Sequence, residues 1–109
     1  MAAKFVVTEG NDGKYYFSLK AANGEVVLSS QGYKNKDDAL NGIDSVKRNS
    51  TDEKRYEVKK SSDDKDYFVL TATNGQTIGK SQMYKSASGC KGGMESVMKN
   101  AGDAATESA

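Results

Sequence analysis

The feature that most constrains this chain is an internal repeat: residues 4–50 align with residues 55–101 at a constant offset and without a gap. Seventeen of the forty-seven aligned pairs are identical, far more than chance would give. Two copies are too few for a solenoid, which needs about three repeats to bury a continuous core. We therefore expect two related units that pack together as the subunits of a symmetric dimer do.

Each copy has the pattern of three short strands. In the first copy, KFVVTE and YYFSLKA alternate apolar and polar residues, and EVVLSS follows as a third apolar run. Between the last two runs stands Asn23-Gly24, and the second copy has Asn74-Gly75 at the same place. This dipeptide favours a two-residue type I′ hairpin, in which both central residues have positive φ. The pattern predicts a three-stranded meander in each copy.

A helix is expected to follow the strands in each copy. Asn35 and Ser86 stand where an N-cap belongs, because their side chains can accept from free backbone N–H groups of the first turn. In the first copy the helix should cover about residues 36–49, with an apolar stripe at helical spacing formed by Ala39, Leu40, Ile43 and Val46. The second helix contains Gly89, Gly92 and Gly93, each of which costs about 1 kcal/mol relative to alanine in a helix interior. We expect it to be the weaker helix.

The pattern as a whole predicts an α+β fold of two tandem β-β-β-α repeats, related by a pseudo-twofold axis, that form one antiparallel sheet with two helices packed on one face. A unit of roughly forty-five residues is marginal alone, so both should form a single domain over residues 1–109. The polar residues 51–54 are expected to be a linker, and residues 102–109 a flexible tail. Because the dimer face is already covered within one chain, we expect a monomer that acts as a fused dimer.

Composition argues against several classes of function. A formal net charge of +1 gives no strong field to attract nucleic acid or anionic lipid. No apolar run is long enough to span a membrane, and the first residues have no secretory core, so we expect a cytoplasmic protein with no membrane partner. With no histidine and one cysteine, Cys90, the usual zinc sites and Cys-His nucleophiles cannot be built. We expect no metal and no cofactor.

The stretches KAANGEVV, SSQGY and NGIDSVKRN, with their second-copy forms TATNGQTI, KSQMY and GGMESVMKN, resemble the YegP-like family of small bacterial proteins. The resemblance extends from Lys4 to Ala101 and keeps the order and spacing of these segments in both copies. It implies a fold in which two units build a single sheet and a short C-terminal strand can be exchanged. It implies no activity, because the family has no established function.

The candidate binding site is the repeated segment Ser-Gln-x-Tyr-Lys between the third strand and the helix. Its residues are Ser30, Gln31, Tyr33, Lys34, Ser81, Gln82, Tyr84 and Lys85. Polar and aromatic groups beside a helix N-terminus can line a groove for a ligand and hold an anion. The alternative interpretation is structural: the tyrosines pack over the core edge, and Ser and Gln satisfy backbone groups at the strand exit.

Three functions remain open. The leading hypothesis is a small non-enzymatic binding or scaffolding domain. The second is single-stranded nucleic-acid binding, through the sheet aromatics Tyr15, Tyr16 and Tyr67 and the duplicated lysines. Those lysines are Lys14, Lys34, Lys65 and Lys85. The third is a small enzyme in which a Tyr-Lys pair of the repeated segment acts as acid and base, although histidine is the residue that proton transfer most often uses.

Overall fold

Residues 3–108, the part of the chain that the computed structural model describes, form an α+β fold, as the sequence predicts. In chain order the elements are β1 (Lys4–Glu9), β2 (Tyr15–Lys20), β3 (Val26–Ser29), α1 (Lys36–Asn49), a 3-10 turn (Glu53–Arg55), β4 (Tyr56–Lys60), β5 (Asp66–Thr71), β6 (Thr77–Lys80), α2 (Ala87–Asn100), a second 3-10 turn (Ala101–Asp103) and β7 (Ala105–Ser108).

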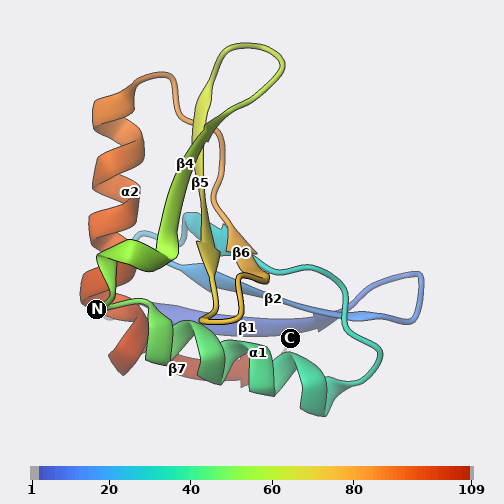
Figure 1. Cartoon of the computed structure of the whole chain (residues 1–109). Helices are drawn as coiled ribbons and strands as arrows, with labels where there is room; N and C mark the ends of the chain where they lie inside the picture. The colour runs from blue at the N-terminus through green and yellow to red at the C-terminus, as the bar shows by residue number, and fades with distance from the viewer. Residues whose placement is uncertain (1–2, 109) are drawn as a thin grey trace.

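All seven strands belong to one sheet, in the order β4-β5-β6-β3-β2-β1-β7. Figure 1 shows β4 and β5 running across the direction of β1 and β2, so the sheet is strongly twisted between its two halves. Five neighbouring pairs are antiparallel, but β7 lies parallel to β1. The prediction of a purely antiparallel sheet is therefore wrong at this edge. Parallel strands need a long connection, and here the intervening strands and helices supply it.

The prediction of a flexible tail over residues 102–109 is also wrong for most of that range, because Ala105–Ser108 form β7. The Lys4 ammonium lies 3.2 Å from the Glu107 carboxylate, and Ala101 and Ala104 are buried just before the strand. The short polar sequence ATES does not alternate apolar and polar residues, so its pattern does not predict a strand. Strand β7 is held mainly by its backbone pairing with β1. Part of the expected linker over residues 51–54 likewise lies in the first 3-10 turn.

The Asn-Gly hairpins form, but with a different turn from the predicted one. Gly24 has φ of 84°, whereas Asn23 does not have positive φ. The Gly24 N–H donates to the Ala21 carbonyl, and the Ala21 N–H donates to the Glu25 carbonyl, both at 2.9 Å. This is a three-residue loop with glycine in the left-handed position. The loop at Gly75 has the same bonds and the same φ.

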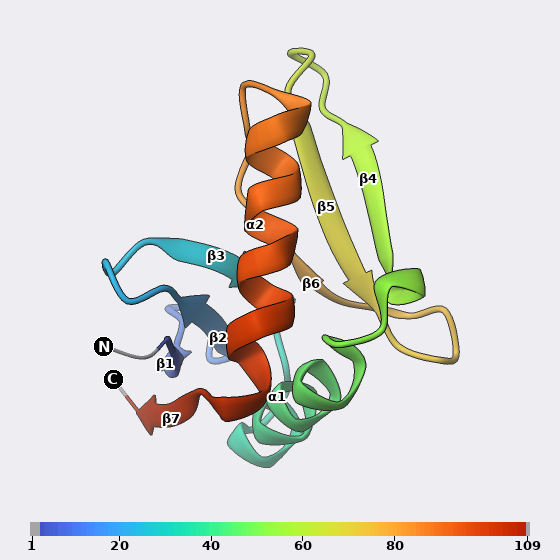
Figure 2. The ribbon, with the colours of Figure 1, turned by 90° about the vertical axis from the view of Figure 1, so that its left-hand side faces the viewer.

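Both helices pack on one face of the sheet and share one core (Figure 2). The predicted N-caps are confirmed: the Asn35 side chain accepts from the Asp38 N–H at 2.8 Å, and the Ser86 hydroxyl accepts from the Gly89 N–H at 3.0 Å. The largest fully buried side chains come from alternate positions of the strands and from the helix stripes. They include Phe5, Phe17, Phe68, Leu19, Leu28, Leu70, Val46 and Val97.

The glycines of α2 differ in what surrounds them. A methyl group on Gly93 would lie 3.2 Å from the Phe68 ring and closer still to the Tyr84 ring. Gly42 of α1 has the same surroundings, because a methyl group there would lie 2.9 Å from the Phe17 ring. Nothing lies within 4 Å of such a group on Gly92. The glycine that both copies share therefore permits close contact between helix and sheet, and Gly92 does not.

Two neighbouring substitutions in α2 should have opposite effects. Gly93→Ala forces an aromatic ring to move and should lower the free energy of unfolding by about 1–3 kcal/mol. Gly92→Ala meets open space, removes backbone freedom from the unfolded chain and should raise it by about 0.5–1 kcal/mol. Urea denaturation followed by circular dichroism measures both. Equal effects of the two variants would contradict this account of the shared glycine.

The β4–β5 turn offers a stabilising substitution. Asp64 has φ of 66° in the left-handed region, where the aligned residue of the first copy is Gly13 with φ of 79°. Asp64→Gly relieves this backbone strain and should stabilise the protein by about 0.5–1 kcal/mol. Asp64→Asn is the matched control, because asparagine removes the charge that lies 3.5 Å from Lys60 but keeps the side chain. Thermal denaturation that ranks glycine no higher than asparagine would refute the prediction.

Candidate functional site

The two copies of the repeated segment leave the sheet at its centre, where β3 and β6 are neighbours. Ser29 and Lys80 form the one paired position between these strands. A groove of about 440 Å³ opens around this junction. It is lined by Val26 and residues 29–31 of the first copy and by residues 77–82 of the second. One groove therefore draws on both halves of the chain.

The two serines of the repeated segment hold the backbone at the strand exit. The Ser30 hydroxyl accepts from the Phe17 N–H at 2.9 Å and donates to the Gln31 carbonyl at 2.7 Å. The Ser81 hydroxyl makes the equivalent bonds with Phe68 at 2.9 Å and with the Gln82 carbonyl at 2.8 Å. Each hydroxyl already has a donor and an acceptor, so its first role is structural.

The two glutamines and a lysine form the polar part of the groove lining. The Gln82 side-chain amide donates to the Glu25 carboxylate at 2.6 Å, which ties the second copy to the hairpin of the first. Gln31 is exposed. The Lys80 ammonium lies 4.9 Å from the centre of the Tyr67 ring, in the position of a cation–π contact. An amine and two amides thus stand beside the apolar side chains of the groove.

The tyrosines of the repeated segment do not line this groove. Tyr33 stacks on Phe17 with ring centres 6.0 Å apart, and Tyr84 stacks on Phe68 at 6.5 Å. Burial raises the pKa of both phenols above the usual value of 10. Burial thus favours the neutral, protonated form of both side chains.

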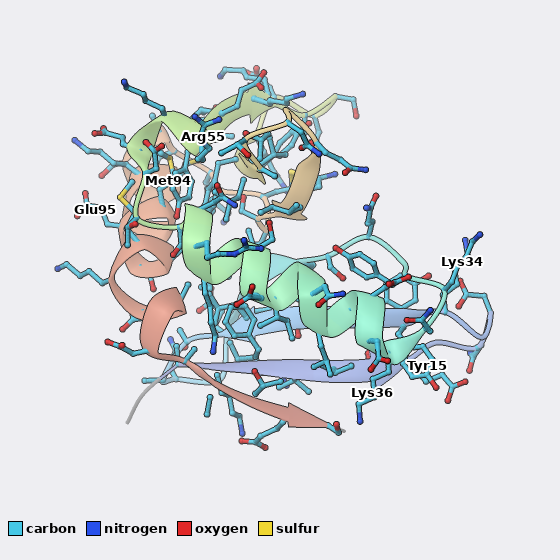
Figure 3. All side chains as sticks on the ribbon, turned by 60° about the horizontal axis from the view of Figure 1, so that its bottom comes forward. Tyr15, Lys34, Lys36, Arg55, Met94 and Glu95 are labelled. Atoms are coloured by element: carbon cyan, nitrogen blue, oxygen red, sulfur yellow. The ribbon has the colours of Figure 1, made fainter. Side chains whose placement is uncertain are left out.

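Lys34 and Lys85 are exposed and also lie outside the groove. Figure 3 shows Lys34 at the outer end of the molecule, beside the start of α1. The structure thus brings together Ser30, Gln31, Ser81 and Gln82 of the predicted site, and directs the tyrosines into the core edge. Whether these residues bind a ligand stays a prediction.

The sequence did not indicate six of the groove residues: Val26, Ser29, Thr77, Ile78, Gly79 and Lys80. Ser29 and Lys80 occupy aligned positions of the two copies, but they are different residue types. The identical pairs of the repeat therefore do not include them. A second hollow of about 440 Å³ also includes Gln31 and Ile78, and it lies between the start of α1 and the β5–β6 hairpin. Tyr33 lines this second hollow.

Other candidate chemistry is sparse within residues 3–108. Cys90 is 1% exposed in the core, and burial raises the pKa of its thiol. Among these residues no group of three or more Cys, Asp and Glu side chains could hold a metal ion. No helix that they form is long and apolar enough to cross a membrane. The cytoplasmic location stays a prediction.

Comparison with known proteins finds a family model, described as the domain of unknown function DUF1508, that matches residues 11–57 and again residues 61–107. Among curated proteins, the UPF0339 protein PA0329 of Pseudomonas aeruginosa is 50% identical over 97 residues, which cover 89% of this chain and 88% of that protein. The UPF0339 protein YegP of Yersinia pestis is 47% identical over 96 residues, covering 88% and 86%. The resemblance to the YegP-like family is thus confirmed.

Solved structures agree with these matches. The solution NMR structure of YegP from E. coli, titled a protein of unknown function, has a TM-score of 0.93 at 42% identity and covers 99% of this chain and 93% of that one. The solution NMR structure of the UPF0339 protein SO3888 from Shewanella oneidensis has a TM-score of 0.92 at 41% identity, covering 99% and 92%. The overall fold is therefore shared with experimentally determined relatives.

The titration of Tyr56 should make the fold sensitive to alkali. Its hydroxyl donates to the Ser50 carbonyl at 2.7 Å, and burial raises the pKa of Tyr56 well above 10. The unfolded chain then loses this proton at lower pH than the folded one, so the contribution of Tyr56 to stability is constant below about pH 10 and falls above it. Urea denaturation between about pH 7 and about pH 11 should show this fall.

Tyr56→Phe provides the control for the alkaline prediction. The variant loses the hydrogen bond to Ser50 and should be less stable by about 1 kcal/mol at neutral pH. It should also lose less of its stability in alkali than the parent protein does. An alkaline slope that is the same in both proteins would mean that the Tyr56 phenol does not contribute to it.

Proposed function

The chain belongs to the DUF1508 family, and we propose that it is a non-enzymatic binding module in which two related units share one ligand groove. The observation that carries the proposal is the position of the groove at the junction of β3 and β6. Residues of both copies line it, and the two polar segments that the copies have in common begin there. Binding sites of small molecules are concave and combine apolar surface with a few placed polar groups.

The proposal includes the pseudo-twofold arrangement of two β-β-β-α units over residues 4–50 and 55–101. The two matches of the family model support a duplication, although each begins later in its unit and ends in the strand that follows the helix. Aligned residues also make equivalent contacts. Ser30 and Ser81 form the same pair of hydrogen bonds, and both helices place a glycine against a stacked tyrosine.

The groove lining indicates the class of ligand. Val26 and Ile78 supply apolar surface, Gln31 and Gln82 supply amides, and Lys80 supplies the positive charge. A lysine in such a place attracts an anionic group, and the amides can donate to it or accept from a neighbouring polar group. The ligand we propose is a small molecule with an apolar body and one acidic group.

Binding rather than catalysis fits the chemistry of the groove. The hydroxyls of Ser30 and Ser81 are already engaged with the backbone, and no histidine is present in the chain to activate them. The tyrosines that the enzyme hypothesis requires lie against the core aromatics, and their neighbouring lysines are exposed. A catalytic acid and base would need to meet at one bound substrate.

Single-stranded nucleic-acid binding is less well supported. Tyr15 packs against the core on the helix side of the sheet, so it does not share a face with its neighbour Tyr16. The Tyr16 hydroxyl donates to the Asp12 carboxylate at 2.7 Å, which places a negative charge beside this ring. Lys80 lies over the Tyr67 ring. These aromatics do not form a common stacking platform flanked by positive charge.

The binding proposal can be tested by amide NMR titration of the labelled protein with a pooled set of small carboxylates and phosphates. Shifts should cluster at residues 26–31 and 77–82. Ser29→Tyr should abolish binding by filling the groove, and Lys80→Ala should weaken it about tenfold through the lost charge. Lys85→Ala is the matched control, because Lys85 is an exposed lysine of the same segment outside the groove.

The same titration with mixed-sequence single-stranded DNA and RNA, at low and moderate salt, separates the two classes of ligand. Nucleic-acid binding should weaken steeply with salt, whereas binding of a compact monoanion should follow salt only slightly. Shifts confined to scattered surface lysines, or equal weakening by Lys80→Ala and Lys85→Ala, would reject the groove as the site.

A further inference from the structure

Strand β4 is the one long edge of the sheet that has no neighbour within residues 3–108 (Figure 2). Its counterpart in the first copy, β1, is covered by β7 on the corresponding side. The exposed fractions of two aligned valines reflect this difference. Val58 of β4 is 54% exposed, whereas Val7 of β1 is 2% exposed. An apolar residue that is buried in one copy is thus left in solvent in the other.

We propose that β4 is the docking site for a second copy of this chain, which pairs with it antiparallel through its own β4. The directions of the backbone groups support the pairing. Asp66 of β5 donates its N–H to the Tyr84 carbonyl at 3.0 Å, and the Phe68 carbonyl accepts from the Ser81 N–H at 2.9 Å. Both residues therefore direct their backbone groups away from β4. Because the directions alternate along a strand, those of Tyr67 between them point toward β4.

The same alternation fixes the outer edge of β4. Tyr67 pairs with Lys59 and Val69 pairs with Glu57, so the backbone groups of Lys59 and Glu57 face β5. Val58, between them, directs its N–H and C=O outward. In β1 the aligned residue Val7 is in register with β7. The free edge thus offers a donor and an acceptor at its centre, where the valine side chain is also exposed.

The side chains of β4 are complementary to a second β4 in antiparallel register. With Val58 opposite Val58 of the second copy, Glu57 lies opposite the second copy's Lys59, and the reverse pair forms by symmetry. Valine meets valine on one face of the joined sheet, and two pairs of opposite charge form on the other. Such cross-strand pairs stabilise a sheet, whereas like charges directly opposite destabilise it. The sequence YEVKK is therefore compatible with itself.

A different occupant, β7 of a second copy, fits this edge less well. On β1 it lies parallel, with Glu107 in register with Val6. The position of β4 that aligns with Val6 is Glu57. A β7 strand in this register on β4 would place Glu107 opposite Glu57, which are like charges. Antiparallel pairing of two β4 strands avoids this repulsion. The contact is small, so the dimer should be weak and form as the concentration rises.

Two charge substitutions provide a test that does not depend on a change in the fold. Glu57→Lys gives a strand with lysine at both positions, and Lys59→Glu gives one with glutamate at both. Each variant alone should lose the dimer, because like charges then face each other. An equimolar mixture of the two should form a heterodimer, since every facing pair is again of opposite charge. Sedimentation velocity over a wide range of concentration measures the association.

Hydrogen exchange locates the contact. The Val58 amide should become protected in the wild-type protein as the concentration rises, and the Tyr67 amide, which already faces β4 within the chain, serves as the reference. Val58→Pro removes only an outward N–H, so it should keep β4 paired with β5 and abolish the dimer. Amide NMR spectra show whether each variant is folded.

The outcomes are distinct. Concentration-dependent dimerisation that is lost in both single variants and restored in their mixture supports the proposal. A wild-type protein that stays monomeric at the highest concentration reached overturns it. A dimer that persists unchanged in Glu57→Lys and in Val58→Pro also overturns it, because the contact then lies elsewhere on the molecule.

Discussion

The junction of β3 and β6 depends on one large side chain that packs against a residue with none. Leu28 occupies the space that a side chain on Gly79 would need, with its nearest carbons 2.7 Å from where that Cβ would stand. These two positions are aligned between the copies and lie next to the proposed pseudo-twofold axis. In a symmetric dimer one residue type must occupy both positions, and two leucines would collide. A fused chain can place leucine on one side and glycine on the other, so that Leu28 occupies the space beside Gly79.

This asymmetry at the centre has a counterpart at the two edges of the sheet. The strand after α2 is β7, which pairs with β1. The strand after α1 is β4 itself, and it has to begin the second half of the sheet. One copy therefore gains a covering strand and the other does not. For this reason the aligned valines differ in burial: Val7 is buried and Val58 is exposed.

Local signals predicted the elements well, and long-range geometry limited the rest. The caps at Asn35 and Ser86 follow from residue chemistry within one helical turn, and the structure confirms them. The turn at Gly24 differed because asparagine can act as an acceptor for the Glu25 N–H instead of adopting positive φ. The residue pattern did not predict strand β7, because its partner β1 is distant in the sequence and pairs with it through the backbone. Four of the ten groove residues were predicted. Residues such as Ser29 and Lys80 were not, because their proximity depends on the pairing of two strands that are distant in the sequence.

The groove and the junction share the same physical cause. Strands β3 and β6 pair only at Ser29 and Lys80. The twist between the two halves of the sheet moves the strands apart on either side of this pair, and the groove lies in the space between them. The ligand that we propose for this space would contact both units and add its binding free energy to the interactions that join them. Ligand binding and the mutual orientation of the two units should therefore be coupled. The repeated polar segments begin at this junction of the two units.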